Sequence, residues 1–438
     1  MAMIPQNLIS LVGIFVLLGL AWLLSKHRKA INYRVIVGGL IIQAIVALFV
    51  FVVPFGTSVF LVVNDLVVQI LTSAAAGTKF LFGRLALGPG MTSDTGETSL
   101  GFFLAFQALP TVVFFAALMG LLYYAGIMPL FVKLFSRIFV TLMRISGAES
   151  MCAASNIFVG VESTLVIRPY LGDMTRSELC TVLTAGMGTI ASSMLAFYVM
   201  ILRNDFPTIA GHLVSASILA APGAVVMSKI LYPETETPKT LGIRVEPYYE
   251  RETNFVEAIM NGATAGTKLV VGIAGMLLAF LGLVALVDLI LGALGSPLSR
   301  LLGTDTQWSL TTLLGYLFYP LALIIGVPVT DATVVAKVVG ERTILTEVVA
   351  YQDLAKILAA QGLSDPRSAV VTVYALCGFA HIASMAIFVG GASALAPQRV
   401  KDLSAIGFRA LLAATLSSLL TGAWAGVFFV RGSLLLGQ

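Results

Sequence analysis

Long apolar stretches separated by short polar or basic loops make up most of this chain. Each is close to the ~20 residues that a helix needs to cross the hydrocarbon core of a bilayer. We therefore expect an all-α polytopic membrane protein with about eight spans. The expected spans cover residues 8–25, 35–53, 101–126, 177–202, 206–231, 265–294, 368–391 and 404–430.

Two further apolar segments are interrupted by groups that a lipid-facing helix does not tolerate. Residues 156–171 contain Glu162 together with an asparagine, an arginine, a glycine and a proline, and residues 327–354 contain Glu347 beside other charged groups. Broken backbone at membrane depth is tolerated only where protein or a water-filled cavity surrounds it. Both segments are thus predicted to be re-entrant hairpins whose tips line a substrate site.

Residues 129–145 and 308–325 carry the pattern of helices that lie at the membrane interface or insert only partly. The stretch at 57–100 is apolar but ends in a polar loop of mixed charge, so it is left without a span and placed on the outer side. This division gives scaffold spans in 1–128, a first repeat in 129–232, a connecting region in 233–307 and a second repeat in 308–438. An odd number of crossings separates the repeats, so they are expected to be inverted, which is typical of secondary transporters.

Composition excludes a soluble protein, because 58% of the residues are hydrophobic, only 11% are charged, and the mean hydropathy is +0.98. The net charge of +4 comes without a basic run interleaved with aromatics, so no nucleic-acid partner is expected. The cysteines and histidines have neither disulfide nor metal-ligand spacing. The densest basic loop, residues 26–34, belongs in the cytoplasm by the positive-inside rule, which puts both termini on the outer side.

The two hairpin carboxylates are the first candidates for a site, since ionisable groups inside a membrane are costly and usually functional. Glu162 and Glu347 are expected to accept hydrogen bonds from a hydroxyl-rich solute. The alternative is a structural partnership with Arg168 or Arg342.

Two hydroxyl-bearing segments follow the hairpins at matching places. Thr189 and Ser192 are three residues apart, as are His381 and Ser384, so each pair is predicted to share a helix face. Asn156, the carbonyls after it and Thr189 offer neutral oxygens that suit a small monovalent cation. His381 is interpreted either as a neutral core residue or as a proton carrier, and the sequence does not separate the two.

Motifs along nearly the whole chain resemble the concentrative nucleoside transporter family. They include residues 28–34, 106–111, 123–128, 156–160, 165–170, 257–263, 326–328, 347–351, 374–380 and 395–399. The resemblance implies two opposed hairpins, a homotrimer in the bacterial inner membrane, and elevator-like uptake of nucleosides coupled to sodium or protons. It implies no organic cofactor.

The resemblance also assigns residues to a sodium site and a nucleoside site. Sodium would be held by Asn156, the carbonyls of Val159 and Ile190, and Thr189. The substrate-binding residues would be Val161, Glu162, Met194, Glu347, Phe379, His381 and Ser384.

This sequence departs from the family pattern at the substrate site. The first hairpin tip, Gly160-Val161-Glu162, is one residue shorter and lacks the family's glutamine, its hydroxyl before the glutamate, and its proline. Thr346 and His381 replace asparagines. Since unpaired buried polar groups carry much of a site's discrimination, we expect an altered base preference or a modified nucleoside-like solute.

Other function classes fit less well. A channel with the same hairpins would need a ring of like groups around a symmetry axis, and the paired groups here are unlike. A membrane-embedded enzyme would need an oriented nucleophile, and no acidic residue is placed to orient His381 and Ser384. The same fold carrying a different hydroxylated solute remains the main alternative.

Overall fold

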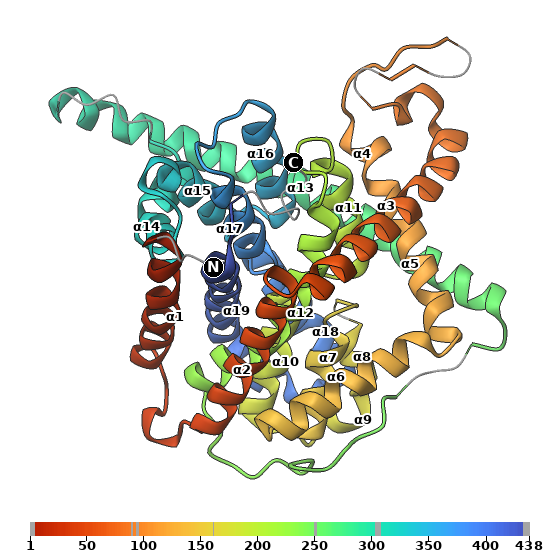
Figure 1. The fold of residues 1–438 in the computed structure, drawn as a ribbon, viewed down its shortest axis with the longest axis vertical. Coiled ribbons are helices and arrows are strands. Elements are labelled where there is room, and N and C mark those ends of the chain that lie inside the picture. The colour runs from red at the N-terminus through yellow and green to blue at the C-terminus, as the bar shows by residue number, and fades with distance from the viewer. Residues whose placement is uncertain are drawn as a thin grey trace.

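The computed structural model describes residues 5–88, 91–92, 96–160, 162–248, 252–302 and 308–431. Within these ranges the chain is helical and its β-bridges are isolated. The fold is that of an all-α polytopic membrane protein, as the sequence predicts (Figure 1). Val161, one of the expected site residues, lies outside the described ranges.

The N-terminal part contains helices that match three expected spans and one helix that the sequence analysis left unassigned. The third helix, α3, has 29 residues and is apolar enough to cross a membrane. The sequence analysis was therefore wrong to leave the stretch at 57–100 without a span. The most apolar part of α3 is as hydrophobic as stretches that were assigned as spans, so the polar loop after it caused the omission. The helices are α1 (Pro5–Leu23), α2 (Tyr33–Phe51), α3 (Pro54–Phe82), α4 (Leu104–Gln107), α5 (Leu109–Tyr124) and α6 (Ile127–Met143).

The first repeat begins with a hairpin that is longer than predicted. Its first arm is α7, and Asn156 caps that arm rather than starting the hairpin. The second arm is split into α8 and α9 because Pro169 restarts the helix. The elements are α7 (Gly147–Ser155), α8 (Ser163–Val166), α9 (Arg168–Leu171), α10 (Arg176–Gly188), α11 (Ser192–Leu202) and α12 (Ile209–Leu231).

The second repeat has the same order after a long connecting helix. A hairpin is again followed by a broken helix and then by an unbroken one. The elements are α13 (Phe255–Leu302), α14 (Leu310–Ile324), α15 (Val329–Arg342), α16 (Glu347–Ala359), α17 (Pro366–Leu376), α18 (Ile382–Leu395) and α19 (Val400–Phe428). In Figure 1 the first hairpin (α7–α9) lies toward the bottom and the second (α15, α16) toward the top.

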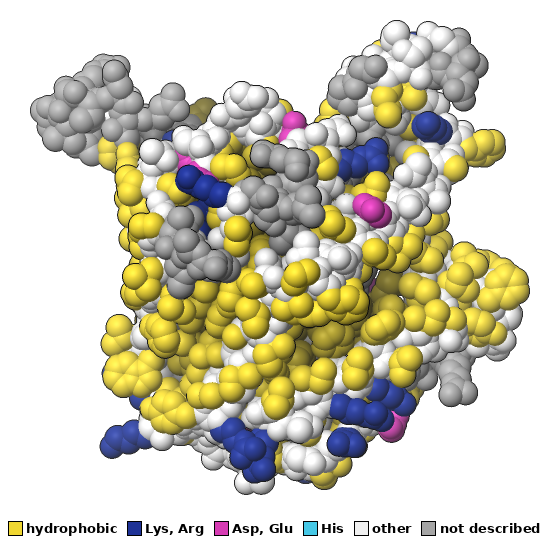
Figure 2. Space-filling model, viewed as in Figure 1, with side chains coloured by type: hydrophobic (Ala, Val, Ile, Leu, Met, Phe, Trp, Pro, Cys, Tyr) yellow, Lys and Arg dark blue, Asp and Glu magenta, His cyan; other side chains and the backbone are white. Residues whose placement is uncertain are grey.

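Among the described residues, eight helical stretches are long and apolar enough to cross a membrane. These eight stretches differ from the eight expected spans in one place. They include α3, whereas the expected span at 368–391 is divided into α17 and α18. Figure 2 shows a broad apolar band with Lys and Arg side chains both below and above it.

Burial separates a central bundle from peripheral helices. In their most apolar windows, 89% of α12 and 83% of α10–α11 is buried, against 17% of α13. The α13 helix instead packs along α5, where a Cβ added to Gly262 would come within 2.5 Å of the Ala116 carbonyl oxygen. Small residues permit such close approach of helix backbones in membranes. The broken helix of the first repeat thus lies in the protected centre.

Candidate functional site between the hairpin tips and the broken helices

Each hairpin tip is hydrogen-bonded to the broken helix that follows it. In the first repeat the Phe158 carbonyl accepts from the main-chain N of Ser192 at 3.0 Å and from its Oγ at 2.6 Å. In the second repeat the Thr343 carbonyl accepts from the N of Ile382 at 3.2 Å. Ser192 and Ile382 are the first residues of α11 and α18. The two contacts are therefore equivalent and satisfy backbone groups that the helix breaks leave open.

Glu347 is the best-defined polar group of this region. It is the first residue of α16 and only 2% exposed. Tyr198 in α11 donates its hydroxyl to Oε1 at 2.7 Å, and the Nε2 atom of His381 lies 2.9 Å from Oε2. The carboxylate thus joins the second hairpin to broken helices of both repeats.

The hydrogen bonds of His381 determine which ring nitrogen carries the proton. His381 is the N-cap of α18, and its Nδ1 atom accepts from the main-chain N of Ser384 at 3.1 Å. An acceptor nitrogen is unprotonated, so in the neutral ring the proton is on Nε2, facing Glu347. The Ser384 hydroxyl lies 2.7 Å from the His381 carbonyl oxygen and also contacts that of Phe379. His381 and Ser384 therefore form one unit at the helix start.

Two tyrosines complete this cluster, and the sequence analysis missed both. The rings of Tyr198 and Tyr351 stack with centroids 4.3 Å apart and an interplanar angle of 27°. Both side chains are fully buried. Tyr351 could have been suspected, because it follows Glu347 by one helical turn on the same face. Tyr198 carried no such signal, since it comes from the other repeat.

Arg342 does not form the expected alternative partnership with Glu347. Its Nη1 atom donates to the Ala375 carbonyl oxygen at 2.7 Å, near the end of α17. Within the described residues its Nε and Nη2 atoms are buried without a hydrogen-bond partner. The Arg342 side chain therefore fixes the second hairpin to α17 and leaves donors available beneath the tip.

The residues expected to hold sodium lie at the first tip and the break that faces it. Asn156 is completely buried, and its Nδ2 atom donates to the Cys152 carbonyl at 3.0 Å while its Oδ1 atom has no partner within the described residues. Thr189 and Ile190, each 1% exposed, follow the end of α10. A buried neutral oxygen without a donor is a suitable ligand for a monovalent cation. Val159, the fourth residue expected to hold sodium, is half-buried.

One expected pairing of the hydroxyl-bearing segments is wrong. Thr189 ends α10 and Ser192 begins α11, so they do not share a helix face. The N-cap of α11 is Ala191, which makes Ala191 the counterpart of His381. The alignment was displaced because the two breaks differ in length, covering residues 189–191 in one case and 377–381 in the other.

The remaining expected substrate residues are spread around the tips. Glu162 is exposed at the start of α8, whereas Met194 in α11 is 1% exposed. The half-buried ring of Phe379 has its centroid 6.5 Å from that of His381. Of these three residues, Phe379 is the one that a described contact places beside the Glu347 cluster.

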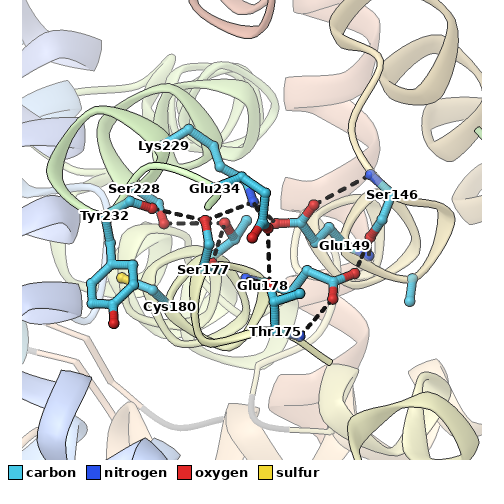
Figure 3. A network of polar contacts seen from close by, with 12 residues as sticks. Ser146, Glu149, Thr175, Ser177, Glu178, Cys180, Ser228, Lys229, Tyr232 and Glu234 are labelled. Carbon is cyan, nitrogen blue, oxygen red and sulfur yellow. Dashed lines mark hydrogen bonds and ion pairs between the residues drawn. The ribbon is translucent and has the colours of Figure 1, made fainter. Parts of the chain in front are cut away.

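A polar network secures the base of the first hairpin, far along the chain from the tips (Figure 3). Lys229 of α12 is buried, and its Nζ atom lies 2.5 Å from Glu149 of α7, 3.4 Å from Glu234 and 3.0 Å from the Ser177 hydroxyl. Glu178 of α10 accepts from the Ser146 hydroxyl at 2.5 Å. These contacts fix α7 and α10 to α12.

The base of the second hairpin is held in a corresponding way. Asp331 of α15 accepts from the Ser368 hydroxyl at 2.6 Å, and Arg367 of α17 donates to Asn7 Oδ1 at 2.6 Å and to the Ser10 hydroxyl at 2.6 Å. Both hairpins are therefore anchored at their open ends by buried charges. Their tips carry the exposed and unpartnered groups.

Family models match the chain from near its N-terminus to near its C-terminus. Models for the N-terminus and the C-terminus of Na⁺ dependent nucleoside transporters match residues 12–85 and 212–426, and a nucleoside recognition model matches residues 105–204. The nucleoside permease NupC of Helicobacter pylori is 36% identical, with 97% of this chain and 99% of that protein aligned. Sodium/nucleoside cotransporter 1 of Rattus norvegicus is also 36% identical, over 97% of this chain and 64% of its own length.

Solved structures give the same result. CNTnw in an inward-facing, substrate-bound state superimposes with a TM-score of 0.86 at 37% identity, covering 97% of this chain and 98% of that one. A CNTnw variant in an outward-facing state also superimposes with a TM-score of 0.86. Together with the paired hairpins and broken helices, these matches show that the chain belongs to the family of Na⁺-dependent nucleoside transporters and is not an enzyme.

Proposed function

We propose that the protein is a secondary active symporter that imports nucleosides, or a nucleoside-like solute, together with sodium. The observation that carries this proposal is the buried carboxylate of Glu347, placed at a hairpin tip between the broken helices of two inverted repeats. Solute and ion sites at such repeat interfaces are the recurrent design of secondary transporters. In this proposal Glu347, His381 and Ser384 bind the solute hydroxyls, while Glu162, Met194 and Phe379 surround the base.

Sodium coupling is supported by the unpartnered Oδ1 atom of Asn156. Asn156, the carbonyls of Val159 and Ile190, and Thr189 would hold the ion through neutral oxygens. Bound sodium would neutralise the open backbone dipoles at the first tip and so prepare the site for the solute. We further propose elevator-type alternating access, in which the hairpins move with the bound solute.

The assembly and orientation follow from the same proposal. The protein acts as a homotrimer in the inner membrane, with both termini on the outer side. The exposed apolar side chains of α13, such as Leu278 at 80% exposure, supply a surface for lipid or a neighbouring protomer. The basic loop at residues 26–34 then faces the cytoplasm.

A second candidate for the coupling ion is the proton, favoured by the contact between His381 and Glu347. A protonated imidazole beside a carboxylate would be held by a buried ion pair, and its loss of the proton would weaken that contact. In that case uptake would be indifferent to sodium and lost when the proton gradient is dissipated.

The test is a thermal-stability screen of the purified protein with pyrimidine and purine nucleosides, free bases, ribose and nucleotides. Each ligand is measured in sodium, in potassium and across pH, because a ligand that binds only the folded state raises the melting temperature by mass action. We expect a nucleoside to stabilise the protein in sodium and less in potassium. Stabilisation by ribose or another hydroxylated solute alone would instead favour the alternative of a different solute.

A further inference from the structure

The second hairpin contains another buried carboxyl group, Glu341, which the nucleoside and sodium sites do not use. It lies in the last turn of α15, just before the tip that carries Glu347. Glu341 is 5% exposed, and its Oε1 atom has no hydrogen-bond partner within the described residues. A buried carboxyl oxygen without a partner is unusual in a folded protein and requires an explanation.

The groups facing Glu341 do not compensate a negative charge there. Among the described residues, the charged side chains that act on Glu341 are Asp353 and Lys356, both from α16. The helices α14 and α17 also pack on α15, and Arg367 of α17 is directed to Asn7 and Ser10 instead. The Nζ atom of Lys356 lies 2.5 Å from Oδ1 of Asp353, and the Lys356 side chain is 75% exposed. Lys356 therefore forms its ion pair with Asp353 at the surface. Arg342, the next residue, is directed to the Ala375 carbonyl instead.

This environment favours a protonated Glu341. An ionised carboxylate there would be desolvated and would face a second carboxylate, and both effects are costly. Asp353 lies against Glu341 and its side chain is 34% exposed. It therefore provides a path by which a proton reaches Glu341 from water.

We propose that Glu341 is a proton-binding site of the second hairpin, with Asp353 as its connection to water. The Glu341 carboxylate binds one proton at the outer side, crosses in the neutral form with the moving hairpin, and releases that proton at the inner side. With solute bound, deprotonated Glu341 resists the crossing because its charge would have to pass a low-dielectric environment. Without solute the hairpin returns with Glu341 deprotonated, so one proton enters with each solute. The inference rests on the proposed transport function, since the proton is driven only if the hairpin moves.

The experiment measures accumulation of radiolabelled uridine and adenosine in proteoliposomes of the full chain. Sodium is equal on both sides, the membrane potential is clamped, and the outside is one pH unit more acidic. One coupled proton supports accumulation of about tenfold under this gradient. The control is Glu246→Gln, which changes a carboxylate that is 81% exposed and pairs with Lys133 at the surface. We expect the wild-type protein and this control to accumulate nucleoside. Glu341→Gln should bring the concentration ratio to one but still exchange labelled for unlabelled nucleoside.

The outcomes separate this site from the others. Accumulation by Glu341→Gln at the wild-type level would overturn the proposal, as would loss of accumulation in His381→Asn with Glu341→Gln unaffected. Wild-type accumulation under a sodium gradient but not under the pH gradient would also overturn it, and would leave the proposed function standing. No uptake of any nucleoside under either gradient would contradict the proposed function itself.

A second variant guards against a folding defect. Glutamine is isosteric with the protonated acid, so Glu341→Gln should fold. The second variant, Asp353→Asn, leaves Glu341 intact and removes its path to water. Asp353→Asn is expected to slow pH-driven uptake without changing the final accumulation ratio. An unchanged rate would exclude Asp353 as the path.

Discussion

The imidazole of His381 contacts the carboxylate of Glu347, which we propose as the group that binds solute hydroxyls. His381 Nε2 and the Tyr198 hydroxyl engage one oxygen each of Glu347, so an incoming hydroxyl has to displace a donor or share it. A hydrogen bond to a charged group contributes about 1.5–3 kcal/mol, which corresponds to roughly 10- to 150-fold in affinity. At this scale His381 is the residue that distinguishes the site from the family pattern.

We therefore predict that His381→Asn changes the order in which nucleosides bind. The asparagine is shorter and carries both a donor and an acceptor, so it frees one oxygen of Glu347 and presents a different pattern to the solute. The measurement is the ratio of dissociation constants for purine and pyrimidine nucleosides. The matched variant Tyr198→Phe, which frees the other oxygen, should strengthen or weaken all of them alike; a uniform change in His381→Asn as well would contradict the prediction.

At the scale of elements, buried charges anchor the bases of both hairpins. Lys229 lies between Glu149 and Glu234, and it is 5% exposed. We predict that Lys229→Met lowers the free energy of unfolding by about 3–5 kcal/mol, because Glu149 would remain buried without its counter-ion. Unfolding by denaturing detergent measures this loss.

The control is Lys239→Met, which removes an exposed ion pair with Asp173. Exposed ion pairs contribute little to stability, so this variant should have the same free energy of unfolding as the wild-type protein. Equal destabilisation by the two substitutions would mean that the network in Figure 3 does not anchor the hairpin as its geometry indicates.

At the scale of the whole molecule, the proposed ion and solute sites lie in different repeats and meet at the interface between them. Asn156 belongs to the first hairpin and Glu347 to the second, and Tyr198 of the first repeat bonds Glu347 directly. Coupling between two binding sites is reciprocal. We predict that saturating sodium raises nucleoside affinity by the same factor by which saturating nucleoside raises sodium affinity, as measured by calorimetry.

Asn156→Ala should abolish this reciprocity, because it removes the unpartnered Oδ1 atom. Nucleoside binding would then be the same in sodium and in potassium. Retention of the full sodium effect in this variant would place the ion elsewhere. The Cys152 carbonyl, which Asn156 also contacts, is unaffected by the substitution apart from losing one donor.

Hydropathy and local composition alone determined the membrane class, seven of the eight candidate spans at least in outline, both hairpins and their carboxylates. These features follow from how many apolar residues stand in a row and where polar groups interrupt them, which is local information. The motifs added the family. The lengths of the helix breaks could not be obtained in this way, so Thr189 was paired with the wrong residue.

Tertiary structure decided which groups meet. Tyr198 and Glu347 are 149 positions apart, and Lys229 joins α7 and α12 across the first repeat. No periodicity within one segment reports such contacts, because they arise from packing two inverted repeats against each other. The contact of His381 with Glu347, the buried proton site at Glu341 and the unpartnered oxygen of Asn156 all depend on neighbours from other helices. For these groups the sequence determined the chemistry available, and the packing decided whether it is satisfied or left open for a ligand.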